Sequence, residues 1–335
     1  MTQGASIIDD LMNPAFLPDK TNSVSVVQTH ISIVFIADEF VYKIKKPVNL
    51  GFLDFTTLEK RHYYCNQEVL LNKRLSKGIY LDVLPIIHDG KSYKIGIGQG
   101  KAVEYAVKMK RLPEHMLMNS VFLRGELNNE HLKKLASVLS QFHLTACNSI
   151  EINKFGNPEI IKVNTYENFK QTEKYIGVTI QKTDFLALKS WTENFYKSKN
   201  DVFLKRIKAG KIRDCHGDLH MEHICLTDDI HIIDCIEFNE RFRYTDTISD
   251  IAFLLMDLEY HGGDEFSKTM WDLYNRFSGE HNMDDLLNFY KVYRAYVRGK
   301  VNSFQIDDEN IDEEKKEDAI QISQKYFKLA RSYIG

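Results

Sequence analysis

The spacing of hydrophobic and polar positions changes once along the chain, close to Leu112-Pro113. Before that point, alternating or β-branched runs predict short strands, and one segment with apolar positions at helical spacing, Thr57 to Leu75, lies between them. Asp38-Glu39 separates two of the runs and predicts a hairpin there. The strands are expected at residues 24–29, 31–37, 40–45, 79–87, 91–97 and 102–109. We therefore expect a small antiparallel β-sheet accompanied by one key helix.

After Pro113, apolar residues recur at spacings of three and four, which is typical of amphipathic helices. Helices are expected at residues 129–147, 166–176, 184–207, 247–260, 264–278, 284–304 and 313–332. One non-helical island, residues 214–244, contains two apolar runs, 224–226 and 230–234, joined by Asp228-Asp229. The pattern indicates the α+β class with two lobes, a β-rich lobe at residues 1–112 and a mostly helical lobe at residues 113–335.

Composition narrows the class of protein. The 335 residues are 43% hydrophobic and 27% charged, which excludes disordered and collagen-like chains. The net charge is −3 and no long basic run occurs, so we expect no nucleic-acid partner. No apolar stretch approaches the ~18 residues of a membrane span, so no membrane partner is expected. Five cysteines without tight pairing favour a reducing, cytoplasmic location.

The island carries the candidate chemistry. It contains His216-Gly217-Asp218-Leu219-His220, and Asp234 ends its second apolar run. Phosphoryl transfer requires a carboxylate that orients the acceptor hydroxyl and oxygen ligands for a metal beside the nucleotide phosphates. Because a hairpin separates Asp218 from Asp234, the two carboxylates can meet at one cleft. The alternative is that Asp218 is a turn residue and Asp234 a strand-end cap.

The His-Gly-Asp-Leu-His motif resembles the catalytic loop of the aminoglycoside-phosphotransferase-like kinases, relatives of choline kinases and protein kinases. The resemblance implies a protein-kinase-like two-lobed fold, with Asp218 as catalytic base and Asp234 as a magnesium ligand. Asp250, near the start of the next helix, resembles the residue that hydrogen-bonds the catalytic-loop backbone in this family. Asp250 could instead only favour the helix dipole.

One position departs from the family pattern. Residue 223, five after Asp218, is a histidine where these kinases usually place a metal-binding asparagine. Mg²⁺ prefers oxygen ligands, whereas imidazole suits Mn²⁺ or Zn²⁺ better. Three interpretations stay open: His223 ligates a metal weakly, Asp234 alone holds a single metal, or the enzyme has lost activity.

Two lysines are candidates for binding the nucleotide phosphates. Lys43 and Lys45 lie two apart on one predicted strand, so their side chains point to the same face. A kinase pairs such a lysine with a glutamate on the following helix, here Glu68. By family resemblance we select Lys43, with Lys45 in reserve; the alternative is a solvated basic strand end.

The resemblance also places two backbone segments at the nucleotide. The turn between the first two strands, which would cross the phosphates, contains no glycine, so Thr29 and Ser32 are expected to help through their hydroxyls. Met109, Lys110 and Arg111 stand where the hinge should hydrogen-bond adenine.

The resemblance covers nearly the whole chain and is strongest to a bacterial branch labelled aminoglycoside phosphotransferase family enzymes, often fused to a P-loop ATPase domain. No P-loop motif occurs in this sequence, so we expect the stand-alone form. The implied activity is transfer of phosphate from ATP or GTP, with Mg²⁺ or Mn²⁺, to a hydroxyl of a small molecule. A nucleotide-binding pseudokinase is the alternative, and the absence of an Ala-Pro-Glu motif argues against a protein kinase.

The acceptor and the oligomeric state, monomer or homodimer, remain open. One late helix carries four cations, which would suit a phosphate or carboxylate on the acceptor: Lys291, Arg294, Arg298 and Lys300. Four acidic residues favour a cationic or hydroxyl-rich acceptor instead: Glu237, Glu240, Asp257 and Glu259.

Overall fold

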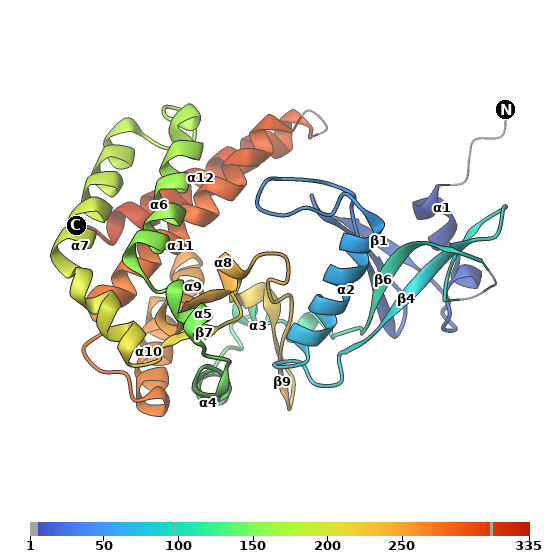
Figure 1. Cartoon of the computed structure of the whole chain (residues 1–335), viewed down its shortest axis with the longest axis horizontal. Coiled ribbons are helices and arrows are strands. Elements are labelled where there is room, and N and C mark those ends of the chain that lie inside the picture. The colour runs from blue at the N-terminus through green and yellow to red at the C-terminus, as the bar shows by residue number, and fades with distance from the viewer. Residues whose placement is uncertain (1–5, 97, 99, 309–310) are drawn as a thin grey trace. The chain divides into compact units, whose positions relative to one another are not determined.

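The computed structural model describes residues 6–96, 98, 100–308 and 311–335. Its contacts divide the chain into two compact units (Figure 1). The sheet unit contains the described residues up to Arg124 together with Glu222–Glu240, and the helical unit contains those of Gly125–Met221 and Arg241–Gly335. The lobes expected at residues 1–112 and 113–335 are inferred from the change in hydrophobic pattern, and they stay a prediction. The two units are defined by contacts between residues and have different bounds.

The sheet unit is built on six antiparallel strands in the order β1-β2-β3-β6-β4-β5. The strands are β1 (Ser25–Gln28), β2 (Ser32–Ile36), β3 (Phe40–Lys45), β4 (Tyr80–His88), β5 (Tyr93–Ile95) and β6 (Ala102–Lys110). The predicted hairpin is confirmed, because β2 pairs with β3 across Asp38-Glu39. β5 ends at Ile95, and Ile97 of the predicted strand lies outside the described residues.

The two faces of β3 have different environments. Tyr42 and Ile44 enter a buried apolar cluster with Phe35 of β2, whereas Lys43 and Lys45, which alternate with them, point to the other face and contact Glu68. On that other face lies the helix α2 (Leu58–Asn72), which packs against β6 and β4. Thr57 caps α2 by accepting a hydrogen bond from the Lys60 N–H, as the predicted start required. The sheet thus brings side chains of β3 within contact distance of side chains of α2.

The sheet unit also contains several short elements. They are α1 (Ile7–Leu11), η1 (Pro14–Phe16), η2 (Glu114–Met116), α3 (Met118–Leu123), β8 (Ile224–Leu226) and β9 (Ile230–Ile232). β8 and β9 form the predicted hairpin. This hairpin is tied to the end of α2, where the Ile232 N–H donates to the Leu75 carbonyl and Ser76 donates to the Ile232 carbonyl. The second strand ends at Ile232 and not at Asp234.

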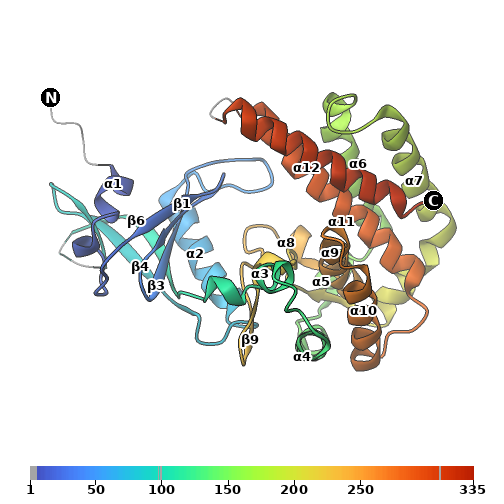
Figure 2. The same ribbon diagram turned by 180° about the vertical axis from the view of Figure 1, so that it is seen from behind.

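The helical unit contains most of the α-helices (Figure 2). They are α4 (Asn129–Thr145), α5 (Ile150–Lys154), α6 (Pro158–Thr172), α7 (Lys182–Lys208), α9 (Thr247–Tyr260), α10 (Asp264–Ser278), α11 (Asp284–Phe304) and α12 (Glu313–Ser332). The bounds of α9 to α12 confirm those predicted. α6 begins at Pro158 and not at Tyr166, because the Asn157 side chain caps it and proline favours the first helical position.

The core of the helical unit lies between α9, α11 and α12. Phe253 and Met256 of α9 pack with Tyr296 of α11 and Phe327 of α12. A Cβ at Gly299 would lie 2.9 Å from the Phe327 ring, so glycine permits this close approach of α11 and α12. None of the described helices is both long and apolar enough to cross a membrane.

Three short elements precede α9. They are β7 (Ile212–Asp214), the four-residue helix α8 (Glu240–Arg243) and β10 (Tyr244–Asp246), which pairs with β7. The Asp246 side chain then caps α9. The predicted catalytic loop follows β7 directly, and its backbone runs past the beginning of α9.

Candidate active site

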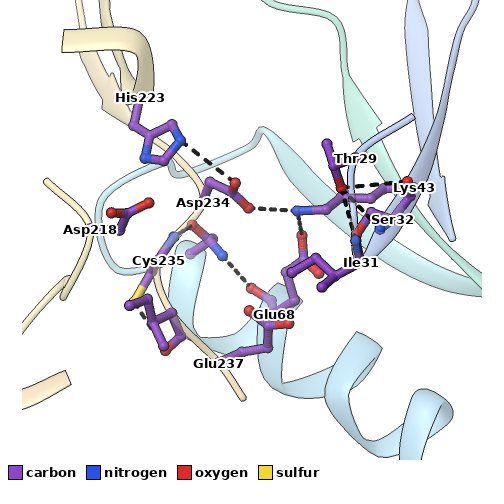
Figure 3. Close-up of polar contacts among 12 residues, drawn as sticks. Thr29, Ile31, Ser32, Lys43, Glu68, Asp218, His223, Asp234, Cys235 and Glu237 are labelled. Carbon is purple, nitrogen blue, oxygen red and sulfur yellow. Dashed lines mark hydrogen bonds and ion pairs between the residues drawn. The ribbon is translucent and has the colours of Figure 1, made fainter. Parts of the chain in front are cut away.

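Lys43 is the centre of a charged cluster in the sheet unit (Figure 3). Its Nζ lies 2.5 Å from Asp234 Oδ1 and 2.9 Å from Glu68 Oε1. Burial alone would lower the pKa of Lys43, but the carboxylates of Asp234 and Glu68 outweigh burial and raise that pKa well above its ordinary value. Lys43 is therefore a permanent cation held between two carboxylates, which is the arrangement that a phosphate-binding lysine requires.

Lys45 reaches the same glutamate from deeper in the unit. Its Nζ lies 2.6 Å from Glu68 Oε2 and also contacts Glu237, and its side chain is only 1% exposed. Burial works against ionisation of Glu68, yet Lys43 and Lys45 together lower its pKa below the ordinary value. Both lysines thus share one face of β3, as their spacing predicted, but Lys45 is enclosed by carboxylates whereas Lys43 adjoins the exposed Asp234.

The backbone of Asp234 is strained. Its φ is +61°, in the left-handed region, which costs a non-glycine residue about 1–2 kcal/mol. Two side chains hold this conformation: the Asp234 N–H donates to the Tyr80 hydroxyl at 3.1 Å, and the Cys235 N–H donates to Asn72 Oδ1 at 2.9 Å. The left-handed residue follows β9 by two positions, and its carboxylate contacts Lys43. Such strain, stabilised by its surroundings, is found mainly at functional sites.

The side chain of His223 lies beside the Asp234 carboxylate. His223, at the end of η4 (Met221–His223), places Nε2 3.6 Å from Asp234 Oδ2, and the Asp234 side chain is 41% exposed. One carboxylate and one imidazole fit a divalent cation that takes its other ligands from water and phosphate, and the imidazole favours Mn²⁺. Asp234 and His223 therefore fit a metal, and both belong to the sheet unit.

The turn between β1 and β2, which is predicted to cross the phosphates, is stabilised by the Thr29 side chain. The Thr29 hydroxyl accepts hydrogen bonds from the Ile31 and Ser32 N–H groups, at 3.3 and 3.0 Å. The Ser32 hydroxyl is buried and has no hydrogen-bond partner among the described residues. Thr29 thus replaces the missing glycine as the residue that shapes the turn, and the Ile31 and Ser32 N–H groups are engaged within it; phosphate binding by this turn stays a prediction.

The predicted hinge lies at the end of β6. Met109 is paired with Val41 on one side and with Tyr80 on the other, so it is part of the sheet. The N–H groups of Lys110 and Arg111 donate to the Ile79 and Glu39 carbonyls, at 2.9 and 2.8 Å. These two backbone donors are engaged within the sheet unit, and adenine binding by this segment stays a prediction.

Asp218 lies in the helical unit, on a loop whose backbone is held by Asp250. The His216 and Gly217 N–H groups donate to the two Asp250 oxygens, at 2.9 and 2.8 Å. Arg294 completes the clamp by donating to the Gly217 carbonyl at 2.9 Å. The expected structural role of Asp250 is confirmed. These contacts fix the loop without requiring the Asp218 carboxylate.

A second layer holds Asp250 itself. His143 of α4 lies with Nε2 3.1 Å from Asp250 Oδ2 and with Nδ1 2.8 Å from the Tyr274 hydroxyl. Burial would raise the pKa of Asp250, but the His143 hydrogen bond and the nearby positive charges lower it well below its usual range. The ionised Asp250 is therefore a firm acceptor for the two loop N–H groups.

The Asp218 side chain is accessible within its own unit. It is 34% exposed, and its Oδ2 lies 3.6 Å from Nε2 of the buried His220. Burial acts to lower the pKa of His220, but the Asp218 carboxylate outweighs burial and raises it. An accessible carboxylate can accept a hydrogen bond from a hydroxyl group.

Sequence reasoning missed several residues that shape the site. Tyr80 and Asn72 hold the Asp234 backbone, His143 supports Asp250, and Glu237 is a buried partner of Lys45. No sequence motif marks them, because each acts on a residue far along the chain; Asn72 and Cys235 are 163 residues apart.

Comparison with solved structures establishes the fold. A choline/ethanolamine kinase family protein of Mesorhizobium loti gives a TM-score of 0.50 at 11% identity, covering 94% of this chain and 92% of that one. A candidate aminoglycoside phosphotransferase of Ralstonia eutropha gives a TM-score of 0.51 at 11% identity, covering 96% and 95%. The expected α+β, protein-kinase-like fold, with an antiparallel sheet followed by a helical part, is confirmed.

Comparison of sequences shows the family. The chain is 31% identical over 279 residues to uncharacterised proteins of Mycobacterium tuberculosis and Mycobacterium bovis, covering 83% of this chain and 54% of theirs. It therefore spans about half the length of the curated relatives that it matches. The model of the phosphotransferase enzyme family matches residues 83–286, which include Asp218 and Asp234. Because this match extends through more than half of the sequence, the chain belongs to the phosphotransferase enzyme family.

Proposed function

We propose that the protein is a kinase that transfers the γ-phosphate of ATP or GTP to a hydroxyl group of a small molecule. The observation that carries this proposal is the position of Lys43, which contacts both Glu68 and the exposed Asp234. A lysine held by a helix glutamate beside a metal-binding aspartate is the phosphate-gripping arrangement of kinases.

Each residue then has a defined task. Lys43 binds phosphate oxygens of the nucleotide, and Glu68 holds the lysine in place. Asp218 orients the acceptor hydroxyl and takes up its proton as the acceptor oxygen bonds to the γ-phosphorus and the bond from that phosphorus to the bridging oxygen breaks. The nucleoside diphosphate leaves with the electrons of the broken bond.

Asp234 and His223 would hold a divalent metal. When bound, Mg²⁺ or Mn²⁺ supplies positive charge that stabilises the phosphate oxygens during transfer. Asp234 presents its carboxylate at a fixed position because the Tyr80 hydroxyl and the Asn72 side chain hold the backbone on either side of it.

Removal of the Asp234 carboxylate tests the proposal. Asp234→Ala is expected to abolish the increase in ATP affinity that Mg²⁺ produces, because the residue that anchors the metal is gone. The measurement is a titration with a fluorescent ATP analogue, in Mg²⁺ and in EDTA. Asp228→Ala, which removes an exposed carboxylate from the β8–β9 hairpin, is the matched control and should behave as wild type.

Two results would change this assignment. An undiminished Mg²⁺ effect in Asp234→Ala would remove Asp234 from the metal site. Nucleotide binding by the wild type without turnover of any compound in a broad panel of alcohols would favour a pseudokinase.

The identity of residue 223 is expected to influence metal preference. Imidazole nitrogen favours Mn²⁺, whereas an amide oxygen favours Mg²⁺. We therefore expect wild-type activity to rise when Mn²⁺ replaces Mg²⁺, and His223→Asn to shift the preference back toward Mg²⁺. Initial rates measured over a range of both metals decide the point, with His231→Asn on β9 as the control. Equal metal preference in wild type and His223→Asn would exclude His223 as a ligand.

A further inference from the structure

The four cations of α11 differ in what neutralises them. Lys291 forms an ion pair with Glu259, whose other oxygen accepts from the Tyr333 hydroxyl. Arg294 is only 5% exposed and donates to the Gly217 and Ser249 carbonyls, which places it among the supports of the catalytic loop. Both residues therefore have structural tasks and are not available to an acceptor.

Arg298 and Lys300, like Arg294, have no carboxylate partner among the described residues, and their hydrogen bonds are not with the catalytic loop. Arg298 hydrogen-bonds the Tyr326 hydroxyl at 3.3 Å and lies over the Tyr326 ring. Lys300 donates to the amide oxygens of Asn168 and Gln171, at 2.7 and 3.0 Å. Neither forms an ion pair with any carboxylate in the part of the chain that the structure describes. Both side chains are partly buried, and a partly buried charge without a counterion is unfavourable.

The pKa of Lys300 is consistent with the lack of a carboxylate partner among the described residues. Burial lowers the pKa of Lys300 to about 8; the carboxylate of Glu167 opposes this shift, and the positive charge of Arg241 adds to it. A bound anion would restore the pKa by supplying the missing negative charge.

Arg298 lies one helical turn after Arg294, which donates at 2.9 Å to the carbonyl of Gly217, the residue before the predicted catalytic base Asp218. Burial acts to lower the pKa of Arg298. The Tyr326 side chain and the Asp218 and Asp257 carboxylates outweigh burial and raise this pKa above its ordinary value, although neither carboxylate is within ion-pair distance. Arg298 and Asp218 both belong to the helical unit. An acceptor whose hydroxyl group reaches Asp218 would thus lie near the guanidinium of Arg298, which forms no ion pair with a described carboxylate.

Three acidic residues that would attract a cationic acceptor are already engaged by other groups: Glu237, Asp257 and Glu259. Glu259 is neutralised by Lys291, and Glu237 contacts the buried Lys45 of the sheet unit. Asp257 is only 4% exposed and accepts a hydrogen bond from the Met221 N–H at 2.9 Å. The balance that the sequence left open therefore favours a negative charge on the acceptor.

We propose that the acceptor is an anionic hydroxyl compound, and that Arg298 binds its carboxylate or phosphate group while Lys300 adds positive charge from the other flank of α11. The inference rests on the proposed kinase activity and specifies its substrate class. Arg298 is the stronger determinant, because a guanidinium can donate two parallel hydrogen bonds to a carboxylate or phosphate.

The first test compares acceptors that differ only in charge. Nucleoside diphosphate release is measured with glycerate, glycerol phosphate, glycerol and 3-amino-1,2-propanediol, and with sugars against their sugar phosphates and sugar acids. The wild type should prefer anionic members, and the first two separate carboxylate from phosphate. Arg298→Gln should lower kcat/KM for the preferred anion by about ten- to a hundredfold, the scale of lost charge-assisted hydrogen bonds. The neutral counterpart should be unaffected, and Lys300→Gln should have a smaller effect.

Two controls accompany these variants. Arg298→Lys should recover part of the loss, since it keeps the charge but not the paired donors. Lys328→Gln removes an exposed positive charge from α12 and should leave all rates unchanged. Turnover of neutral or cationic alcohols equal to or better than their anionic counterparts would overturn the inference while the kinase activity stands.

A second test does not depend on turnover. Sulfate is titrated calorimetrically into the wild type and into Arg298→Gln, Lys300→Gln and Lys328→Gln; Lys43 is unchanged in all four, so binding there contributes equally. The anion site is supported if Arg298→Gln loses sulfate affinity by about tenfold or more and if this loss is larger than in the other two variants. Equal affinity in all four proteins overturns it. If no alcohol is turned over, the kinase proposal fails, and the sulfate titration still decides whether α11 binds an anion.

Discussion

Replacing Asp218 with asparagine is expected to lower turnover by ~10²–10⁴, the usual effect of removing a positioned general base. Asparagine has the shape of aspartate but cannot accept the proton of the acceptor hydroxyl. The fold should be preserved, because the loop is held by Asp250 and Arg294 through backbone groups and the Asp218 side chain is 34% exposed. Nucleotide affinity should stay near the wild-type value.

The measurement combines steady-state turnover of a preferred acceptor with nucleotide titration and thermal unfolding of the same preparations. Asp228→Asn makes the same chemical change at an exposed hairpin position and serves as the matched control. Wild-type turnover in Asp218→Asn would show that another group takes the proton. A joint loss of turnover and stability would instead assign Asp218 a structural task.

The second large effect is expected at Lys45, and it concerns stability. Lys45→Met leaves Glu68 and Glu237 buried without their shared cation, and breaking a buried ion pair in this way destabilises proteins by about 3–5 kcal/mol. Lys43→Met should destabilise less, because Glu68 keeps Lys45 and Asp234 is 41% exposed. Its main effect should be on phosphate transfer, which Lys43→Met is expected to weaken more than Lys45→Met does.

Denaturant unfolding and nucleotide titration of both variants separate these tasks. In Lys45→Met, Glu68 keeps Lys43 and Glu237 loses its cation, so adding Glu237→Gln should recover part of the lost stability. If Lys45→Met were as stable as wild type but more impaired in phosphate transfer than Lys43→Met, the phosphate-binding role would pass to Lys45.

Much of this molecule follows from local sequence patterns. The bounds of α9 to α12, the β2–β3 hairpin and the shared face of Lys43 and Lys45 are set by the periodicity of neighbouring residues. The same holds for the N-terminal caps of α2 and α9, where one polar side chain meets the free N–H groups. The role of Asp250 is expected from the family resemblance, and its contacts with the loop backbone confirm it.

Other features were decided only by tertiary structure. The sequence left open whether Lys43 or Lys45 adjoins Asp234, and contacts across 191 and 192 residues decided it: Lys43 meets Asp234, and Lys45 meets Glu237. The left-handed backbone of Asp234 likewise depends on Tyr80 and Asn72, far along the chain. On α11, periodicity placed four cations, but only packing against other elements showed that Lys291 pairs with a carboxylate and that Arg294 supports the catalytic loop. Local patterns determine secondary structure because backbone hydrogen bonds and side-chain spacing involve near neighbours. The ionic partners of a residue depend on which distant segments fold against it, and a single sequence carries no periodic signal for that choice.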